Sequence, residues 1–145
     1  HAADIIALIE PIFGEYQGVI FDVAEMPELH HIASHFAAAG GAFWCALCGP
    51  AVVGCVGWVR SANGVELRKL YVARSQRRAG LGTRLLARVE RAAAARGAAL
   101  VELWSDVKFA AAHRFYQHHG YRRGPQQRAL NDRSHTVEYY FCKRL

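Results

Sequence analysis

The chain has 145 residues, of which 52% are hydrophobic and 21% charged, with a formal net charge of +6. These values predict one soluble globular domain spanning residues 1–145. No window reaches the roughly 18 unbroken apolar residues of a membrane span, no signal-peptide pattern is visible, and no basic run or nucleic-acid-binding motif occurs. We therefore expect a cytoplasmic protein with neither a membrane nor a nucleic acid as partner.

The first part of the chain predicts two helices joined by a loop. Residues 1–16 carry an apolar stripe at helical spacing, and Pro11 should kink or divide that helix. The loop that follows holds Tyr16 and Phe21, which we expect to be exposed. Residues 27–39 predict the second helix, ended by Gly40 and Gly41. His31 and His35 share a face of it, but no third ligand is evident, so a solvated histidine face is favoured and no metal site is predicted.

Residues 42–48, 51–61 and 65–73 predict three strands joined by short turns, and therefore an antiparallel meander. Cys45 and Cys48 have the spacing of a metal or redox pair. They lie within one predicted strand, where residues three apart face opposite sides, and no second pair completes a zinc site. Buried, reduced thiols are expected for them and for Cys55 and Cys142.

Residues 66–83 read as a strand, a loop and the first turn of a helix. Arg77-x-x-Gly80-x-Gly82 lets a ligand approach the backbone at the glycines, and the helix that follows directs free N–H groups at the loop. Arg77 and Arg78 add positive charge, so the stretch is interpreted as a phosphate or pyrophosphate site. A strand-to-helix turn with a glycine cap is the alternative. The dinucleotide fingerprint lacks its third glycine, and the Walker Gly-Lys-Ser/Thr is absent.

The rest of the chain predicts a helix over residues 80–96, a strand over 99–105, a helix over 110–119 and a final hairpin of 121–130 with 136–143. The helix over 80–96 should connect parallel strands as a right-handed crossover. The predicted fold class is α/β (α+β), with a mixed central sheet of about six strands flanked by about four helices.

Two stretches resemble landmarks of the GNAT superfamily of N-acetyltransferases. Arg77 to Gly82 is similar to the family's pyrophosphate loop, and Ala112 to Tyr121 is similar to its Ala-x-x-x-Tyr helix ending in Gly-Phe/Tyr. The resemblance implies a GNAT-like fold that uses acetyl-CoA. It also implies a strand ahead of the first helix; none is predicted here, so the first family strand is expected to be missing. Many family members carry Asn where this chain has Phe109.

The resemblance implies residue roles as well. The backbone of the loop would bind the cofactor pyrophosphate through Arg77, Arg78, Ala79, Gly80, Leu81, Gly82 and Thr83. The main chain of Leu70, Tyr71 and Val72 would bind the pantetheine arm, with the Leu70 N–H facing the thioester carbonyl.

Tyr116 matches the family's general acid, and Glu66 matches its strand general base, for which a raised pKa is expected. Glu66 paired with Arg68 or Lys69, and Tyr116 as a core aromatic, are the structural alternatives. Glu102 is a second candidate base, and His113 and His119 are candidate proton shuttles.

An acceptor pocket is expected between the loop after the first helix, the strands and the final hairpin. Its predicted lining residues are Tyr16, Phe21, Glu66, Arg68, Trp104, Arg128, Asn131, Ser134 and His135. An arginine there could hold an acceptor carboxylate. The predicted function is acetyl transfer from acetyl-CoA to a primary amine of a small molecule or peptide, by direct attack in a ternary complex. A non-catalytic acyl-CoA-binding regulatory module is the alternative, and a homodimer stays open.

Overall fold

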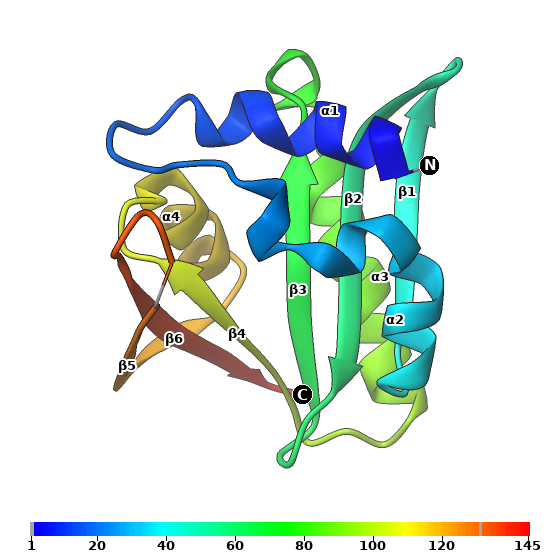
Figure 1. The fold of residues 1–145 in the computed structure, drawn as a ribbon. Helices are drawn as coiled ribbons and strands as arrows, with labels where there is room; N and C mark the ends of the chain where they lie inside the picture. Colours follow the sequence, from blue (N-terminus) through cyan, green and yellow to red (C-terminus); the bar gives the residue numbers. More distant parts are fainter. Residues whose placement is uncertain (1, 131) are drawn as a thin grey trace.

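A twisted six-stranded sheet forms the centre of the computed structural model, which describes residues 2–130 and 132–145 (Figure 1). The strands lie in the order β1-β2-β3-β4-β6-β5. Their bounds are β1 Ala42–Cys48, β2 Ala51–Arg60, β3 Val65–Val72, β4 Leu100–Asp106, β5 Arg122–Ala129 and β6 Val137–Arg144. Only β3 and β4 are parallel, because helix α3 returns the chain between them. The predicted mixed α/β sheet, meander and final hairpin are confirmed.

Four helices cover the two faces of the sheet: α1 Ala2–Phe13, α2 Ile32–Ala38, α3 Leu81–Ala95 and α4 Ala110–His118. Helices α1 and α2 lie over β1 to β3 on one face, and α3 lies behind the same strands (Figure 1). None of these helices combines the length and apolar character that crossing a bilayer requires. As expected, a helix and not a strand is the first element of the described residues.

The two faces of the sheet have separate hydrophobic cores. On the α3 face, Leu86 and Val89 pack with Val65 from β3 and with Tyr116 from α4. On the α1 face, Ile5, Ile9, Phe13 and Leu29 form a second cluster, against which Tyr71 of β3 packs. Tyr71 thus packs on the α1 face of the sheet and Tyr116 on the α3 face. Both lie near the point where β3 and β4 diverge.

The N-terminal helices differ from their predicted extents. Helix α1 runs through Pro11 and ends two residues later, at Phe13, so the proline costs the helix one backbone hydrogen bond and does not divide it. The second predicted helix begins as a 3-10 turn over Pro27–His31 before α2 starts. Another 3-10 turn, Val23–Glu25, lies within the predicted loop, where Asp22 accepts a hydrogen bond from the Ala24 N–H at 3.0 Å.

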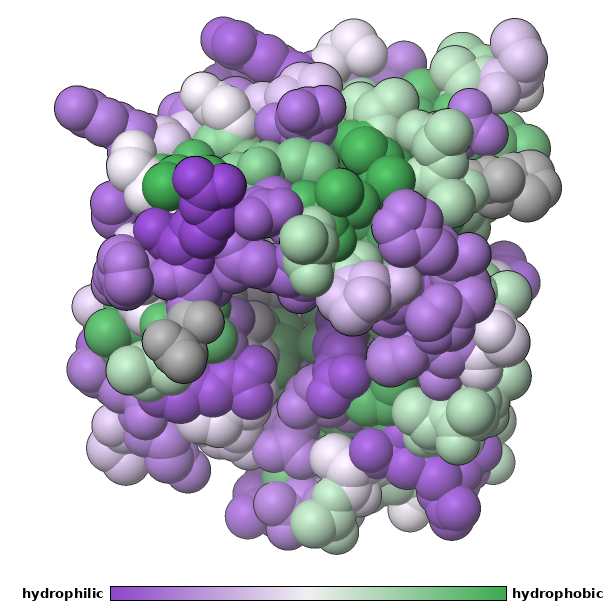
Figure 2. All heavy atoms as spheres, viewed as in Figure 1, coloured by the Kyte–Doolittle hydropathy of each residue, from purple (hydrophilic) through white to green (hydrophobic). Residues whose placement is uncertain are grey.

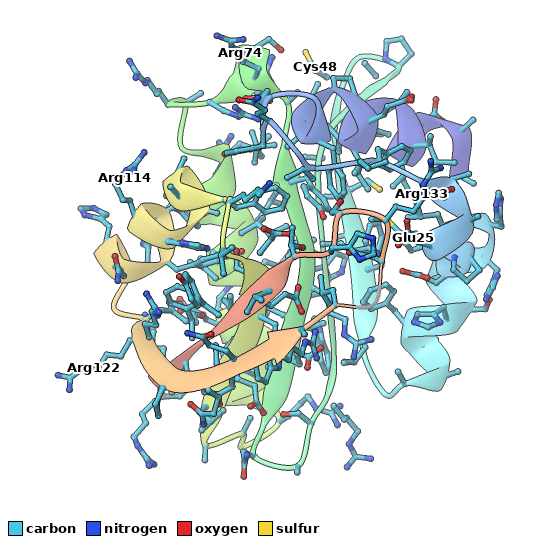
Figure 3. The ribbon with its side chains drawn as sticks, turned by 60° about the vertical axis from the view of Figure 1, so that its left-hand side comes forward. Glu25, Cys48, Arg74, Arg114, Arg122 and Arg133 are labelled. Carbon is cyan, nitrogen blue, oxygen red and sulfur yellow. The ribbon has the colours of Figure 1, made fainter. Side chains whose placement is uncertain are left out.

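The expectation of four buried thiols is wrong for two of them. Cys55 is buried and Cys142 half-buried, but Cys45 and Cys48 are exposed. The reason is that β1 is an edge strand, and Cys48 lies at its end, far from the sheet centre (Figure 3). All four cysteines are free thiols.

Candidate active site

Strand β3 contains a bulge at Lys69 and Leu70. Cys55 of β2 is paired with Tyr71 and Gly57 with Arg68, so two residues of β3 lie opposite one residue of β2. Lys69 takes a left-handed backbone (φ 56°), as the extra residue of a bulge commonly does. The Lys69 ammonium pairs with Glu28 at 2.7 Å, which anchors the bulge to the 3-10 turn before α2. The bulge leaves Leu70 without a partner residue in β2.

The other edge of β3 is open beside the bulge. Strand β4 is paired with β3 only at Val65 and Glu66, and beyond that point the two strands diverge (Figure 1). Leu70 to Val72 therefore have no neighbouring strand on the β4 side. Unpaired backbone at a strand edge can bind an extended ligand as an added strand would. The open edge lies at Leu70 to Val72, the residues that the family resemblance assigns to the pantetheine arm.

The loop after β3 leads into the N-terminus of α3. Gly80 precedes the helix with a left-handed φ of 81°, and a Cβ at this position would meet no atom within 4 Å. No side chain caps the first turn of this 15-residue helix, and that first turn contains no acidic residue. Its free N–H groups and the positive end of its dipole are thus available to an anion. The interpretation of Gly80 and Gly82 as an anion loop is consistent with this geometry.

The side chain of Arg77 is paired with a carboxylate of the same chain. Its guanidinium forms two hydrogen bonds with the Glu15 carboxylate, at 2.5 and 2.7 Å, and its Nε donates to the Val72 carbonyl at 3.2 Å. The hydrogen bond from Arg77 lowers the pKa of Glu15, so the pair is held ionised. Arg77 therefore ties the loop to the segment after α1, and its charge is already neutralised by a carboxylate.

A groove of about 410 Å³, the α3 groove, runs from this loop to helix α4. Its volume is within the usual range for small-molecule sites, about 300–1,000 Å³. All but one of the predicted cofactor-binding residues line it: Leu70, Tyr71, Val72, Arg77, Arg78, Gly80, Leu81, Gly82 and Thr83. Ala79 is exposed in the loop and does not line the groove. Phe115 and Tyr116 of α4 form the opposite wall.

Tyr116 lies at the inner end of the α3 groove. Its side chain is buried, and none of the described residues forms a hydrogen bond with its hydroxyl. Burial raises the pKa of Tyr116 above its ordinary value, so the phenol holds its proton near neutral pH. Tyr116 is thus a core aromatic, as the structural alternative predicted, and it also lines a cavity in which its hydroxyl could donate a proton.

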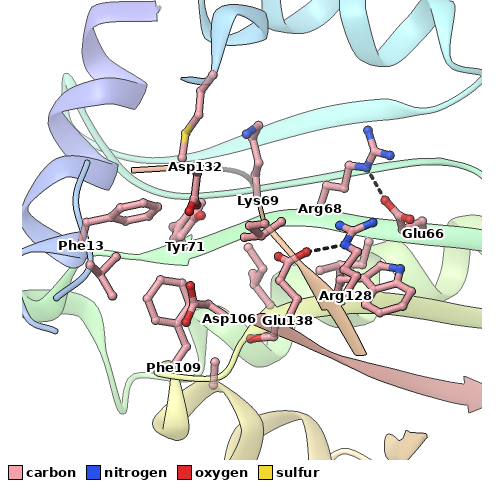
Figure 4. Close-up of a pocket in the computed structure, with 18 of the residues that line it drawn as sticks. Phe13, Glu66, Arg68, Lys69, Tyr71, Asp106, Phe109, Arg128, Asp132 and Glu138 are labelled. Carbon is pink, nitrogen blue, oxygen red and sulfur yellow. Dashed lines mark hydrogen bonds and ion pairs between the residues drawn. The ribbon is translucent and has the colours of Figure 1, made fainter. Parts of the chain in front are cut away.

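A second cavity, the hairpin cavity, lies where β3 and β4 diverge and is closed by the connection between β5 and β6 (Figure 4). It has a volume of about 270 Å³. Figure 2 shows it as a hollow rimmed largely by hydrophilic residues. The two cavities share five lining residues: Leu70, Tyr71, Phe109, Ala112 and Tyr116. A ligand in either cavity therefore reaches the bulge of β3 and Tyr116.

The predicted acceptor pocket is only partly the hairpin cavity. Five of its predicted residues line the cavity: Glu66, Arg68, Trp104, Arg128 and Ser134. Tyr16 lines the α3 groove instead, with its ring 4.9 Å from that of Phe109. Phe21 packs edge-on against Phe13 at 5.4 Å and lines neither cavity, because the loop folds back onto α1.

The remaining predictions for this pocket have mixed outcomes. Both loop aromatics, Tyr16 and Phe21, are half-buried and not exposed as expected. His135 does not line the cavity, and Asn131 lies outside the described residues.

Glu66 forms an ion pair with Arg68, which was the structural alternative for it. The pair forms within the hairpin cavity, where the Glu66 side chain is 14% exposed. Glu102, the second candidate base, lines neither cavity. It is buried in the sheet and accepts hydrogen bonds from Ser61 at 2.5 Å and Tyr140 at 2.7 Å.

His113 of α4 and His119, which follows that helix, line neither cavity. The Nε2 of His113 is 2.9 Å from the Asp106 carbonyl, and burial lowers the pKa of this imidazole. His119 contacts the hydroxyl of Thr83 at 3.1 Å. His31 and His35 lie 6.1 Å apart between ring centroids, and among the described residues no three His, Cys, Asp or Glu side chains are placed to hold a metal ion.

Four carboxylates of the hairpin cavity were not predicted: Glu28, Asp106, Asp132 and Glu138. The sheet register places Glu138 of β6 opposite Asp106 of β4 on one side and Arg128 of β5 on the other. Burial raises the pKa of Glu138, and Asp106 and Glu66 raise it further against the opposing effect of Arg128. The available sequence signal for Glu138 was its position as an acidic residue in the otherwise apolar stretch 137–142.

Comparison with known proteins identifies the family. Residues 39–123, more than half of the chain, match the family model described as acetyltransferase (GNAT) domain. No curated protein matches the chain.

Solved structures share the fold at low sequence identity. A Staphylococcus aureus acetyltransferase of the GNAT family superposes with a TM-score of 0.84 and 23% identity, over 99% of this chain and 92% of that one. A Streptococcus agalactiae acetyltransferase superposes with a TM-score of 0.86 and 23% identity, over 100% and 92%. The PaiA N-acetyltransferase of Thermoplasma acidophilum, solved with coenzyme A, gives 0.76 and 16%, over 99% and 92%. With its splayed β3, uncapped α3 and matched domain model, the chain belongs to the GNAT family of acetyltransferases.

Proposed function

We propose that the protein transfers the acetyl group of acetyl-CoA to a primary amine of a small molecule or peptide, by direct attack in a ternary complex. The observation that carries this proposal is the junction of the α3 groove and the hairpin cavity at Leu70 and Tyr116. A thioester carrier bound in the groove and an amine bound in the cavity would meet there. Holding both reactants at one point is a large part of what such a reaction needs.

Each step of the transfer has a group at this junction. The amine nitrogen attacks the thioester carbonyl carbon, and the Leu70 N–H, freed by the bulge, donates to the oxygen as its charge develops. The carbon–sulfur bond then breaks, and Tyr116 gives its proton to the departing thiolate. The products are the amide and free coenzyme A, and the proton lost by the acceptor passes to a carboxylate of the hairpin cavity.

Two carboxylates can take that proton. Glu66 is the one that matches the family's strand base, and it is paired with Arg68. Glu138 is favoured by its raised pKa, which brings it nearer to neutral pH, where a general base works best. Replacing each by Gln separates the two: the base is the one whose loss removes most of the turnover while acetyl-CoA still binds.

The experiment that tests the proposal measures binding and turnover separately. Calorimetry with acetyl-CoA on the folded protein should give a one-to-one complex, and absence of binding at millimolar ligand would overturn the proposal. Free thiol release is then followed with a panel of amines. Binding of acetyl-CoA without thiol release from any amine would instead support a non-catalytic acyl-CoA-binding module.

A further inference from the structure

The hairpin cavity has more carboxylates than cations in its wall. Excluding histidine, the charged residues that line it are five acids and three bases: Glu28, Glu66, Asp106, Asp132, Glu138, Arg68, Lys69 and Arg128. The chain as a whole has the opposite charge balance, with a formal net charge of +6. Arginines such as Arg114 and Arg122 extend outward from the surface (Figure 3). The acidic wall is therefore a local property of this cavity.

Each of the three bases is already paired with a glutamate of the same wall. Lys69 is 2.7 Å from Glu28, and Arg128 is 2.5 Å from Glu138. Arg68 pairs with Glu66. Arg128 also stacks over the ring of Trp104, 4.5 Å from its centroid, which fixes its guanidinium against the wall. The arginine expected to hold an acceptor carboxylate is thus occupied.

Two aspartates of the wall have no cationic partner among the described residues. Asp106 is 8% exposed, and its two oxygens accept hydrogen bonds from the Lys108 N–H at 2.9 Å and the Thr136 hydroxyl at 2.6 Å. Asp132 comes from the connection between β5 and β6 and reaches the cavity beside Tyr71 (Figure 4). Its Oδ1 is shielded from solvent and has no hydrogen-bond partner.

A shielded carboxylate oxygen without a donor is costly in the empty protein, and a ligand that supplies the donor removes that cost. The described residues offer no group of three acids, cysteines or histidines spaced to hold a metal ion. An extended organic cation with N–H donors therefore fits this wall better than a metal ion does.

We propose that the acceptor amine carries a second ammonium group, which Asp132 binds directly while the Asp106 charge adds to the attraction. This inference rests on the proposed acetyl transfer, because it takes the hairpin cavity as the acceptor site. The attacking amine would lie at Leu70 and Tyr116, and the second ammonium would lie on the side of the β5–β6 connection. An amino acid acceptor would instead bring its carboxylate toward two unpaired aspartates. Burial is the main cause of the raised pKa of Glu138, and Asp106 and Glu66 add to it, so a further negative charge is disfavoured there.

The test compares straight-chain α,ω-diamines with the monoamine and the ω-amino acid of the same chain length, in the full-length protein with acetyl-CoA. We expect the best diamine to exceed its matched monoamine in kcat/KM by about tenfold to a hundredfold, the range of a hydrogen bond to a charged group. The matched amino acid should be the poorest of the three. Equal rates for diamine and monoamine, or a preference for the amino acid, would overturn the inference while leaving acetyl transfer in place.

Asp132→Asn supplies the matched variant, because it keeps the size of the side chain while it removes the charge and replaces one acceptor oxygen by an amide donor. It should remove most of the diamine preference, so that the kcat/KM values of the diamine and its matched monoamine approach each other. Asp22→Asn is the control, since Asp22 pairs with Arg133 of the same connection at 3.5 Å but does not line the cavity. Calorimetry with the best diamine alone gives a second readout that needs no turnover. Diamine binding that Asp132→Asn does not weaken would refute the assignment even if no amine were acetylated.

Discussion

Replacing Tyr116 by Phe should separate catalysis from folding. The change deletes one hydroxyl that has no hydrogen-bond partner among the described residues, and it keeps the ring that packs on Phe141 and Tyr121 at centroid distances of 6.1 and 5.8 Å. Stability should therefore change by no more than about 0.5 kcal/mol, as for a substitution that removes no contact. Loss of a general acid typically lowers the rate by about a hundredfold or more, equivalent to about 2.7 kcal/mol of activation free energy.

Tyr121→Phe is the matched control in the same core cluster. The Tyr121 hydroxyl donates to the Glu90 carboxylate at 2.9 Å, on the side of α3 away from both cavities. Its removal should cost about 1.5–3 kcal/mol of unfolding free energy, since the acceptor is charged. Because Tyr121 does not line the junction, turnover should stay close to that of the unmodified protein.

The assays are thiol release for kcat and KM, calorimetry for the acetyl-CoA Kd, and urea unfolding for stability. We expect the Tyr116 variant to lose kcat with an unchanged Kd and urea midpoint, and the Tyr121 variant to lose stability alone. An unchanged kcat in the Tyr116 variant would remove this residue from the mechanism. A large loss of stability with the loss of rate would show that its role is structural.

Three further predictions concern the base, the loop and its anchor. If Glu138 is the base, kcat/KM of the unmodified protein should rise with pH through a pKa above the usual glutamate range. The Glu138→Gln variant should not show this rise. Gly80→Ala and Gly97→Ala should each lower the free energy of unfolding in urea by about 1–2 kcal/mol, because both glycines have a left-handed backbone and no atom near an added Cβ. Only the Gly80 variant should weaken acetyl-CoA binding, since Gly80 lines the α3 groove. Equal Kd values for the two variants would contradict the role of the loop. Glu15→Gln should cost at most about 1 kcal/mol near neutral pH, because its pair with Arg77 is partly exposed. That contribution exists above the unfolded pKa of Glu15 and is lost as pH falls through the lowered folded pKa, so unfolding curves of the two proteins should converge in acid.

Local patterns in the sequence were sufficient for the framework of the site. The strand patterns and short turns of residues 42–48, 51–61 and 65–73 predict the meander, and the apolar spacing of residues 80–96 predicts the crossover helix, because each pattern depends only on near neighbours. The spacing from Arg77 to Gly82 predicts the anion loop, since a left-handed residue and an uncapped helix start are encoded within six positions. Tyr116 was singled out by the resemblance of residues 112–121 to a landmark of the family.

Contacts between distant segments required the folded chain. Arg77 pairs with Glu15, which lies 62 positions away in the sequence, and this pair anchors the loop. Phe21 carries no local sign that its loop folds back onto α1. The exposure of Cys45 and Cys48 likewise depends on β1 being the edge of the sheet, and edge position is set by strand order.

The amino-acid sequence alone determined the order of the elements and the glycine turn that precedes α3, because those features are set by residues close together in the chain. The character of the acceptor cavity came from the fold. Asp106, Glu138 and Arg128 form one row across β4, β6 and β5 only because the register aligns them, and a slip of one residue would turn those side chains to the other face. Which charges are paired in that cavity, and which carboxylates stay without a cation, is therefore a property of the assembled sheet.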